Sequence, residues 1–419
     1  MGDRDWAGAR DAPDTGLPAP ILEGALRAKA LVVAEDYRGY DPYDALASPV
    51  FAWPLLRARL VRRVGQQVLK RSPVNIRPLL GISKGRNPVT LALGVQAWAQ
   101  LASVDVEHRD WYTAEATRLV RELEALATPG WSGACWGYDF DWETRDSTLE
   151  AFVPTIVATG FVTNALVNAH ERLGIDGALE LCESACRFVQ RDLFRTPGPA
   201  EGFCWSYSPK DRTRVLNATA KGARLLAQVG ALADRPELFA EARQTLDYVT
   251  HWQRDDGSWP YAVDDPRTWA DNFHTGYVLD ALTEYRARTG DAGLDDAVDR
   301  GWRYYRSRFF DDGWRPRYYD TSALPVDCTA VAQSMITLCR FGDVSTALRI
   351  AAWSLDELQR EDGGFIYRVN RRHTNRIQYL RWSTAWMLAG LATVLAAAER
   401  DPDDDAWRAA AIPEAARVS

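Results

Sequence analysis

The strongest constraint on the fold is a unit that recurs five times along the chain. Each copy has a Gly/Asp-rich turn, an aromatic residue, a polar loop that often contains arginine, and a small hydroxyl residue that opens an apolar run. The copies read GACWGYDFDWETR, GFCWSY, DGSWPYAVDDPRTWADNFHT, DGWRPRYYDTSALPVDCT and DGGFIYRVNRRHTNRIQYLRWS. Such repetition is typical of an architecture built from one supersecondary unit.

The hydroxyl residues give the period of the repeat. Successive copies are 60, 56, 54 and 54 residues apart, measured between Thr159, Thr219, Thr275, Thr329 and Ser383. Thr90 lies 69 residues before the first of these and makes a sixth copy. Serine and threonine cap exposed amides at helix N-termini, so we expect each of them to begin a helix. Each unit is long enough for two helices and their loops.

Two kinds of helical segment alternate along the chain. Segments such as FVTNALVNAH and AWMLAGLATVLAAA are apolar nearly all round and are expected to be buried on more than one side. Segments such as ELFAEARQTLDYVTHWQ and ALRIAAWSLDELQ are amphipathic. This alternation predicts an all-α fold, an (α/α)6 toroid with an inner and an outer ring of helices. An open solenoid is the main alternative.

The repeat also indicates the domain organisation. We expect a flexible N-terminus at residues 1–20, an N-terminal arm or lid at 21–80, the toroid at 81–400 and a tail at 401–419. The segment DYRGYDPYDALASP within the arm is rich in turn residues and tyrosines.

Charge and composition exclude several classes of protein. The net charge of −7 is unlike that of a general nucleic-acid binder. We find no apolar stretch long enough for an integral membrane segment, no signal-peptide core, and no basic amphipathic helix that would indicate membrane attachment. The six cysteines include no CxxC pair and are expected to be buried thiols. These features favour a cytoplasmic protein.

A toroid predicts one site where the loops converge. All inner helices begin at the same end, so their N-terminal partial charges and the preceding loops share one mouth. Aromatic side chains in these loops can stack on sugars or isoprenoid cations, and arginines can bind carboxylates or phosphates. The predicted substrate-binding residues are Tyr138, Trp142, Arg145, Trp205, Tyr207, Trp259, Trp314, Arg317, Tyr318, Tyr319, Asp327, Tyr367 and Arg381. Of these, Trp205, Trp259 and Trp314 are expected mainly to buttress the hairpin junctions, with direct stacking on a ligand as the alternative.

His274 is the most specific catalytic candidate, because it is one of only five histidines and lies in a loop rich in acids. With Asp271, Asn272 and either Tyr261 or Tyr277, it could abstract a proton next to a uronate carboxylate. Alternatively, His274 bonds only to a neighbouring loop.

Three aspartates form a second candidate group. Asp139 and Asp141, together with Asp265, could make a general acid/base pair across the mouth. The alternative is that they cap helices and pair with Arg145 or Arg267. No metal-ligand spacing, phosphate-binding glycine loop or GxSxG elbow is present, so we expect neither a metal nor a cofactor.

Several motifs resemble known families. GYDPYDALASP, KRSPVNIRPLLGI, CWGYDFDWETR, WADNFHTGYVLDALTEY and EDGGFIYR resemble, in this order, the VpsJ-type polysaccharide-biosynthesis proteins. This resemblance implies an (α/α)6 toroid and brings no catalytic residues with it. The stretch from Gln253 to Trp259, QRDDGSW, resembles the QW repeat of squalene and terpene cyclases, where such repeats brace the hairpins. The DxDD proton donor of class II cyclases is missing.

Three functions remain open from the sequence. The first is a carbohydrate-active enzyme of polysaccharide biosynthesis or modification, a lyase, epimerase or hydrolase acting on an acidic sugar, an oligosaccharide or a polyprenyl-linked substrate. The second is a terpenoid or isoprenoid cyclase-like enzyme. The third is a non-catalytic glycan-binding protein. Fold alone does not decide among them.

Overall fold

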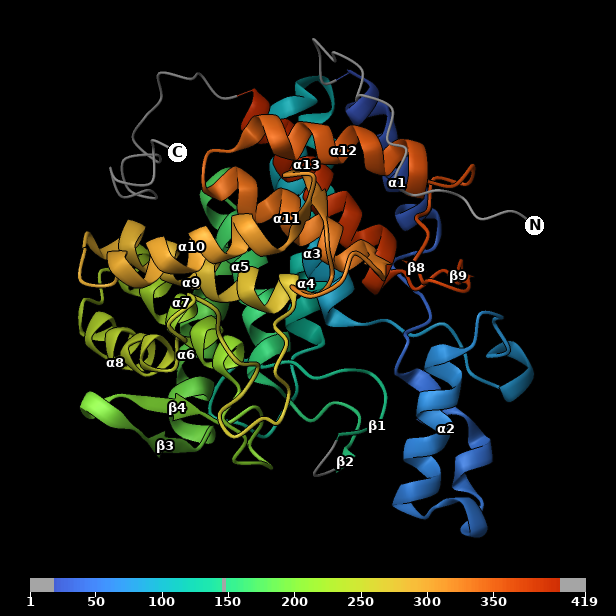
Figure 1. Ribbon diagram of the computed structural model, residues 1–419, viewed down its shortest axis with the longest axis horizontal. Helices are drawn as coiled ribbons and strands as arrows, with labels where there is room; N and C mark the ends of the chain where they lie inside the picture. The colour runs from blue at the N-terminus through green and yellow to red at the C-terminus, as the bar shows by residue number, and fades with distance from the viewer. Residues whose placement is uncertain (1–18, 145–147, 400–419) are drawn as a thin grey trace.

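The computed structural model describes residues 19–144 and 148–399 and confirms the toroid (Figure 1). The predicted Arg145 site and the tail at 401–419 lie outside the described residues. Each inner helix packs on the next, and the last packs on the first, which closes the ring. The inner helices are α3 (Pro88–Val104), α5 (Ile156–Leu173), α7 (Leu216–Leu232), α9 (Asn272–Thr289), α11 (Cys328–Arg340) and α13 (Trp386–Ala398).

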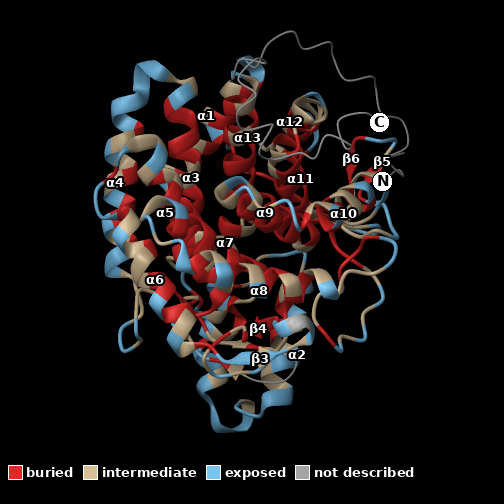
Figure 2. Cartoon of the chain, turned by 90° about the vertical axis from the view of Figure 1, so that its left-hand side faces the viewer, coloured by how far each residue is buried: buried red, intermediate tan, exposed pale blue. Residues whose placement is uncertain are grey.

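The outer helices bury one face against the ring and expose the other, as the burial colouring shows (Figure 2). They are α4 (Arg109–Ala125), α6 (Ala178–Asp192), α8 (Glu237–His251), α10 (Asp295–Arg308), α12 (Val344–Leu358) and α1 (Ala19–Ala34). The first of these in the sequence, α1, lies within the segment that we expected to form an arm. It packs against α12 and α13 and so stands beside the last inner helix.

Two QW-like turns show that α1 occupies an outer-helix position. Gln253 Nε2 donates to the carbonyl of Ala297 in α10 at 2.9 Å, and Gln359 Nε2 donates to the carbonyl of Gly24 in α1 at 2.8 Å. Each turn therefore fastens its loop to the next outer helix. The expectation that these repeats brace the hairpins agrees with this geometry.

Glycines in the same turns allow the close approach. Gly257 and Gly363 both have positive φ, and a Cβ on either would lie within 2.4 Å of a carbonyl oxygen, of Arg300 in α10 and of Arg27 in α1 respectively. No side chain fits there, so a glycine is required at both positions.

The repeated hydroxyl residues do not cap the helices, which corrects our prediction. The N-caps of α3, α5, α9 and α11 are Asn87, Thr155, Asp271 and Asp327. Thr159, one turn inside α5, instead accepts a hydrogen bond from the backbone N–H of Trp136 at 3.2 Å. Thr219 likewise bonds the carbonyl of Trp205 at 3.3 Å, whereas Thr275 donates to the carbonyl of Asp271 at 2.8 Å, one turn back in the chain.

Short antiparallel strands stiffen the long loops that precede the inner helices. β1 (Trp142–Glu143) pairs with β2 (Thr148–Leu149), β3 (Arg195–Pro197) with β4 (Phe203–Trp205), and β5 (Phe310–Asp311) with β6 (Arg315–Pro316). A three-stranded sheet has the order β7 (Val326–Asp327), β8 (Arg368–Val369), β9 (Thr374–Asn375). A π-helical turn, η7 (Arg381–Ala385), leads into α13, and the remaining 3₁₀ turns of the ring are η5 (Val106–His108) and η6 (Pro199–Glu201).

The chain between α1 and α3 forms an arm beside the mouth. Its elements are η1 (Asp44–Ala47), η2 (Pro49–Ala52), η3 (Pro54–Leu56), α2 (Arg59–Arg71) and η4 (Pro78–Leu80). Arg77 is fully buried and bonds Asp44 at 2.7 Å and the hydroxyl of Tyr379 at 3.0 Å. These buried polar bonds fix the arm to the ring. None of the helices in the described part of the chain is long and apolar enough to span a bilayer.

Candidate functional site

The loops at the N-terminal ends of the inner helices enclose a cleft of about 770 Å³ on the side facing α2. Arginines, aromatic rings and carboxylates share its walls, as expected for the mouth. The polar and aromatic residues that line it are Tyr43, Arg63, Gln66, Gln67, Trp142, Glu143, Thr144, Tyr207, Asp211, Arg212, Thr213, Arg214, Tyr261, Asp264, Asp265 and Arg267.

His274 and Asp271 form a hydrogen-bonded pair in a separate recess of about 10 Å³, which shares Tyr261 with this cleft. Asp271 Oδ1 accepts from the backbone N–H of His274 at 2.9 Å, and its Oδ2 lies 2.6 Å from His274 Nδ1. The Asp271 side chain is only 3% exposed, whereas that of His274 is 26% exposed. A carboxylate on Nδ1 favours the tautomer in which Nε2 is a base. No described residue bonds to Nε2 of His274, so this nitrogen is available.

Tyr261 joins the histidine to the cleft. The Tyr261 ring lies edge-on to that of His274, with 4.8 Å between the ring centroids. The guanidinium of Arg267 also packs on Tyr261, 4.0 Å from its ring centroid. Burial raises the pKa of Tyr261, so the phenol is protonated at neutral pH and can donate. Arg267 also donates from Nε to Asp265 at 2.8 Å.

Tyr277 lies one turn along α9 from His274, with 6.0 Å between their ring centroids. It stacks with Trp386 at 6.0 Å between ring centroids and packs edge-on to Phe161 at 5.3 Å. Lys221 Nζ lies 3.7 Å from the Tyr277 ring centroid on the side away from the mouth. Because its hydroxyl is in a buried setting, the pKa of Tyr277 is raised.

A smaller recess of about 220 Å³ lies where the arm meets the mouth. Asp41 of the arm forms an ion pair with Arg381, whose guanidinium lies 4.6 Å from the ring centroid of Tyr138. Burial raises the pKa of Asp139, which also accepts from Asn87 Nδ2 at 3.3 Å. Tyr138 and Asp139 therefore lie together with Arg381, as expected, but Arg381 already has a carboxylate partner.

The structure brings several predicted residues together at the mouth and separates others from it. Half-buried side chains that reach the cleft or its rim include Trp142, Tyr207, Tyr261 and Tyr318. Asp141 bonds Arg62 of the arm at 3.1 Å.

Other predicted residues have structural surroundings, which differs from our expectation. Trp205, Trp259 and Trp314 are buried beneath the turns, and Trp259 donates to the carbonyl of Val249 at 3.1 Å. The buttressing alternative therefore describes these tryptophans. The side-chain amide of Asn272 is fully buried; it donates a hydrogen bond to Ser334 and accepts one from Tyr305. It faces neighbouring helices rather than a substrate.

The remaining predicted residues hold loops in place. Arg317 is paired with Asp311, and Tyr319 packs edge-on to Trp269. Asp327 caps α11 and accepts from Arg368 at 2.7 Å. Tyr367 is buried against Tyr379, with ring centroids 4.8 Å apart.

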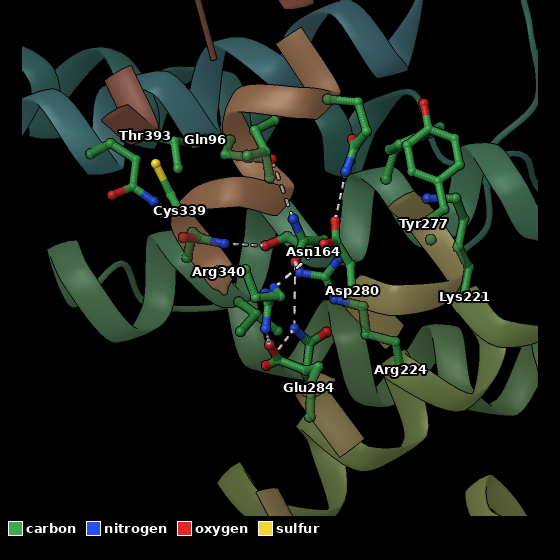
Figure 3. A pocket seen from close by; sticks show the side chains of 18 of the residues that line it. Gln96, Asn164, Lys221, Arg224, Tyr277, Asp280, Glu284, Cys339, Arg340 and Thr393 are labelled. Atoms are coloured by element: carbon green, nitrogen blue, oxygen red, sulfur yellow. Dashed lines mark hydrogen bonds and ion pairs between the residues drawn. The ribbon is translucent and has the colours of Figure 1, made fainter. Parts of the chain in front are cut away.

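A second, charged cavity of about 550 Å³ occupies the C-terminal half of the inner ring (Figure 3). Here Glu284 accepts from Arg340 at 2.9 Å and from Arg288 at 3.0 Å. Burial opposes ionisation of Glu284, but Arg340, Arg224 and Arg288 together hold its pKa below the usual range. Lys221 is 5% exposed and makes no ion pair with any described residue, and burial lowers its pKa well below the ordinary value.

Sequence reasoning missed this cavity and the contribution of the arm to the mouth. The signal for the cavity was a set of charges at helical spacing inside otherwise buried helices, as at Lys221 and Arg224. The signal for the arm was the Tyr- and Asp-rich segment containing Asp41 and Tyr43. Among the described residues no group of three His, Cys, Asp or Glu side chains is placed to hold a metal ion.

Comparison with known proteins supports the fold. No protein-family model matches the chain and no curated protein is similar to it in sequence, so the VpsJ-type resemblance gains no support. Cellobiose 2-epimerase from Bacillus thermoamylovorans B4167 has a similar structure, with a TM-score of 0.61 and 10% identity, covering 91% of this chain and 99% of that one. For a sugar epimerase from a ruminal bacterium the TM-score is 0.57 at 10% identity, covering 77% and 91%.

A family 76 glycoside hydrolase (mannosidase) from Bacteroides thetaiotaomicron VPI-5482 is similar over 90% of this chain and 99% of that one, with a TM-score of 0.55 and 12% identity. At these identities the likeness concerns the fold. The chain thus has the (α/α)6 toroid found in carbohydrate-active epimerases and hydrolases.

Proposed function

We propose that the mouth is the active site of a carbohydrate-active enzyme that moves a proton on an acidic sugar or a sugar linked to a lipid carrier. The observation that carries this proposal is the His274–Asp271 pair, whose imidazole packs edge-on against the ring of Tyr261. Tyr261 lines the cleft that contains the arginines and separates it from the small recess of His274. The shared fold with sugar epimerases supports a carbohydrate substrate.

In the proposed reaction His274 Nε2 removes the proton from the carbon next to the sugar carboxylate. The electron pair of the broken C–H bond moves into the carboxylate and forms an enediolate. Arg212 and Arg267 line the cleft and offset this charge. Arg212 makes no ion pair with a described residue, so it is the stronger candidate for the carboxylate.

Tyr261 supplies the second proton transfer. If its hydroxyl returns a proton to the same carbon from the side of His274, the configuration is retained and the reaction is seen only as hydrogen exchange, because the Tyr261 ring packs against that of His274. If it protonates the leaving oxygen on the next carbon, the C–O bond breaks and the enzyme is a lyase. The raised pKa of Tyr261 keeps the phenol protonated before either step.

The other readings have less support. A hydrolase would need two carboxylates with different protonation states; the pKa of Asp139 is raised, but Asp139 lines the smaller recess at the arm, and Asp141 and Asp265 are paired with Arg62 and Arg267. A cyclase would need a dry aromatic cavity, and this cleft carries several charged groups. A purely binding protein would not need an imidazole with a buried carboxylate behind it.

Hydrogen exchange in D2O tests the proposal. Hexuronates, their oligosaccharides and reducing disaccharides are incubated with the protein, and proton NMR follows loss of the signal at the carbon next to the carboxyl or carbonyl group. We expect exchange with at least one hexuronate, and His274→Asn should slow it at least about a hundredfold. His251→Asn, on the exposed side of α8, is the matched control. Exchange at the wild-type rate in His274→Asn would rule out this role.

A further inference from the structure

The arm carries an unusual concentration of exposed apolar side chains. We call residues 50–79 the arm lobe. Eight of the twelve large hydrophobic residues that are exposed in the described chain lie within it, including Trp53 at 69%, Leu55 at 87% and Leu79 at 87% exposure. The lobe projects from the ring beside the loops of the mouth (Figures 1 and 2). Scattered exposed hydrophobics are ordinary, but a cluster of this kind indicates a contact surface.

Helix α2 within the lobe exposes an apolar stripe to solvent, whereas an ordinary surface helix buries its apolar side. Leu60, Val64 and Val68 follow one another at every fourth residue, so they form one stripe, and they are 74%, 54% and 61% exposed. On the opposite side Gln66 is buried and bonds the backbone of Glu143 at 2.9 Å. The side of α2 that faces the protein buries Gln66 and Leu69, and the stripe of Leu60, Val64 and Val68 faces away.

The lobe is also strongly basic in an acidic protein. It contains seven arginines and lysines and no acidic residue, whereas the whole chain has a net charge of −7. Some of these cations are used inside the protein, as in the ion pair of Arg62 with Glu143. Arg57, Arg63 and Arg71 are exposed and make no ion pair with any described residue. An apolar stripe flanked by unpaired cations complements a surface that has an apolar interior beneath an anionic outer layer.

We propose that the arm lobe docks on an anionic membrane surface. Leu60, Val64 and Val68 enter the boundary between headgroups and acyl chains, and the unpaired arginines bind anionic headgroups. Because Arg63 and Gln67 of α2 also line the cleft, docking holds the mouth next to the membrane. The enzyme would then meet substrates carried on lipids. The docking itself does not depend on the chemistry proposed for the mouth.

Vesicle co-sedimentation tests the docking without any substrate. The wild-type protein should sediment with vesicles of equal parts phosphatidylglycerol and phosphatidylcholine, and not with pure phosphatidylcholine. Binding should fall as salt is raised from about 0.1 M to about 0.5 M. We expect Leu60→Ser/Val64→Ser/Val68→Ser to lower the partition coefficient at least about tenfold. Val106→Ser, which alters a residue 65% exposed on the ring, should leave it unchanged.

The unpaired cations are tested separately. Arg63→Gln/Arg71→Gln should weaken binding to the anionic vesicles and flatten its dependence on salt. Circular dichroism and thermal unfolding check that each variant folds. Since the altered side chains are exposed, their melting temperatures should match the wild type.

A fluorescent label distinguishes insertion into lipid from contact with another protein. All six native cysteines are buried, so Val64→Cys provides a specific site for an environment-sensitive dye. We expect a blue shift with anionic vesicles at Val64→Cys and none at Val106→Cys. The proposal is overturned if the wild type ignores anionic vesicles at low salt, or if the triple serine variant binds as well as the wild type. A shift that grows with protein concentration in the absence of lipid would also overturn it, because a second copy would then cover the stripe.

Discussion

The ion pair between Asp41 and Arg381 leads to a quantitative prediction, because it joins the arm to the ring in a buried setting. Both side chains are 7% exposed, and Arg381 Nη2 and Nε lie 2.5 and 2.6 Å from Asp41 Oδ2. Asp41→Ala leaves the guanidinium buried without its carboxylate. Breaking a buried pair from one side costs about 3–5 kcal/mol.

This cost converts into a measurable change in melting temperature. An unfolding entropy of about 2.1 cal/mol/K per residue amounts to ~0.9 kcal/mol/K for a chain of this length, so Asp41→Ala should lower Tm by roughly 3–6 °C. In Asp41→Ala/Arg381→Met no unpaired charge remains, and part of the loss should be recovered. Differential scanning calorimetry measures both variants.

The matched control removes an exposed pair. Glu150→Ala breaks the surface contact with Lys210 and should leave Tm within experimental error of the wild type. Limited proteolysis of Asp41→Ala should also cut the arm faster than it cuts the ring. A Tm shift of less than about 1 °C for Asp41→Ala, with no faster cleavage of the arm, would refute the reasoning.

Three further predictions concern the ring. Lys221→Met should raise the free energy of unfolding at neutral pH by about 1–3 kcal/mol, because it removes a buried ammonium that has no acidic partner among the described residues. Burial lowers the pKa of Lys221 in the folded state, so below the ordinary lysine pKa of about 10.4 the unfolded state binds more protons than the folded state. The stability of the wild type therefore rises with pH over this range. Urea titrations should show that the stability gained by Lys221→Met shrinks as the pH approaches ~10. Asp271→Ala should lower the free energy of unfolding by about 1 kcal/mol because the cap of α9 is lost, whereas Asp271→Asn keeps the cap. Both variants should lose exchange activity in D2O. Equal unfolding curves for the two variants would contradict the capping role. Five cysteines should resist a thiol reagent in the native protein and react in guanidinium, because burial raises their thiol pKa values, to about 12 for Cys135; fast native-state reaction of Cys135, Cys182, Cys186, Cys204 or Cys328 would be inconsistent with the structure.

The ring could be predicted from the sequence because its two determinants are local. A period near 55 residues set the size of each hairpin, and the contrast between apolar and amphipathic segments identified inner and outer helices. The position of α1 could not be found this way. It completes the last hairpin from the other end of the chain, and the long arm separates it from α3.

Individual side chains in the mouth were harder to predict, because the loop sequence does not show which way each one points. His274 and Asp271 were selected because histidines are few and this loop is rich in acids; the sequence did not show that Asp271 caps the helix and bonds the imidazole. Asn272 lies between them in sequence, but it is the first residue of α9 and its side chain points between helices, where it bonds Ser334 and Tyr305. The tryptophans of the repeat were considered for buttressing the hairpin junctions and for ligand stacking, and they are buried beneath the turns.

The role of the arm depended on orientation. Our sequence analysis found no basic amphipathic helix, yet α2 is one, with Leu60 and Val64 on its apolar side. Periodicity alone cannot tell whether such a side faces the core or the solvent. Only the contacts of Arg62 and Gln66 with the β1 loop establish that the apolar side is outside.

A crystal structure of His274→Asn soaked with a hexuronate would test the proposed site most directly. The account predicts the sugar in the cleft of the mouth, with its carboxylate on Arg212 or Arg267 and the adjacent carbon facing residue 274. A sugar bound instead in the C-terminal cavity beside Lys221, with the mouth empty, would contradict it.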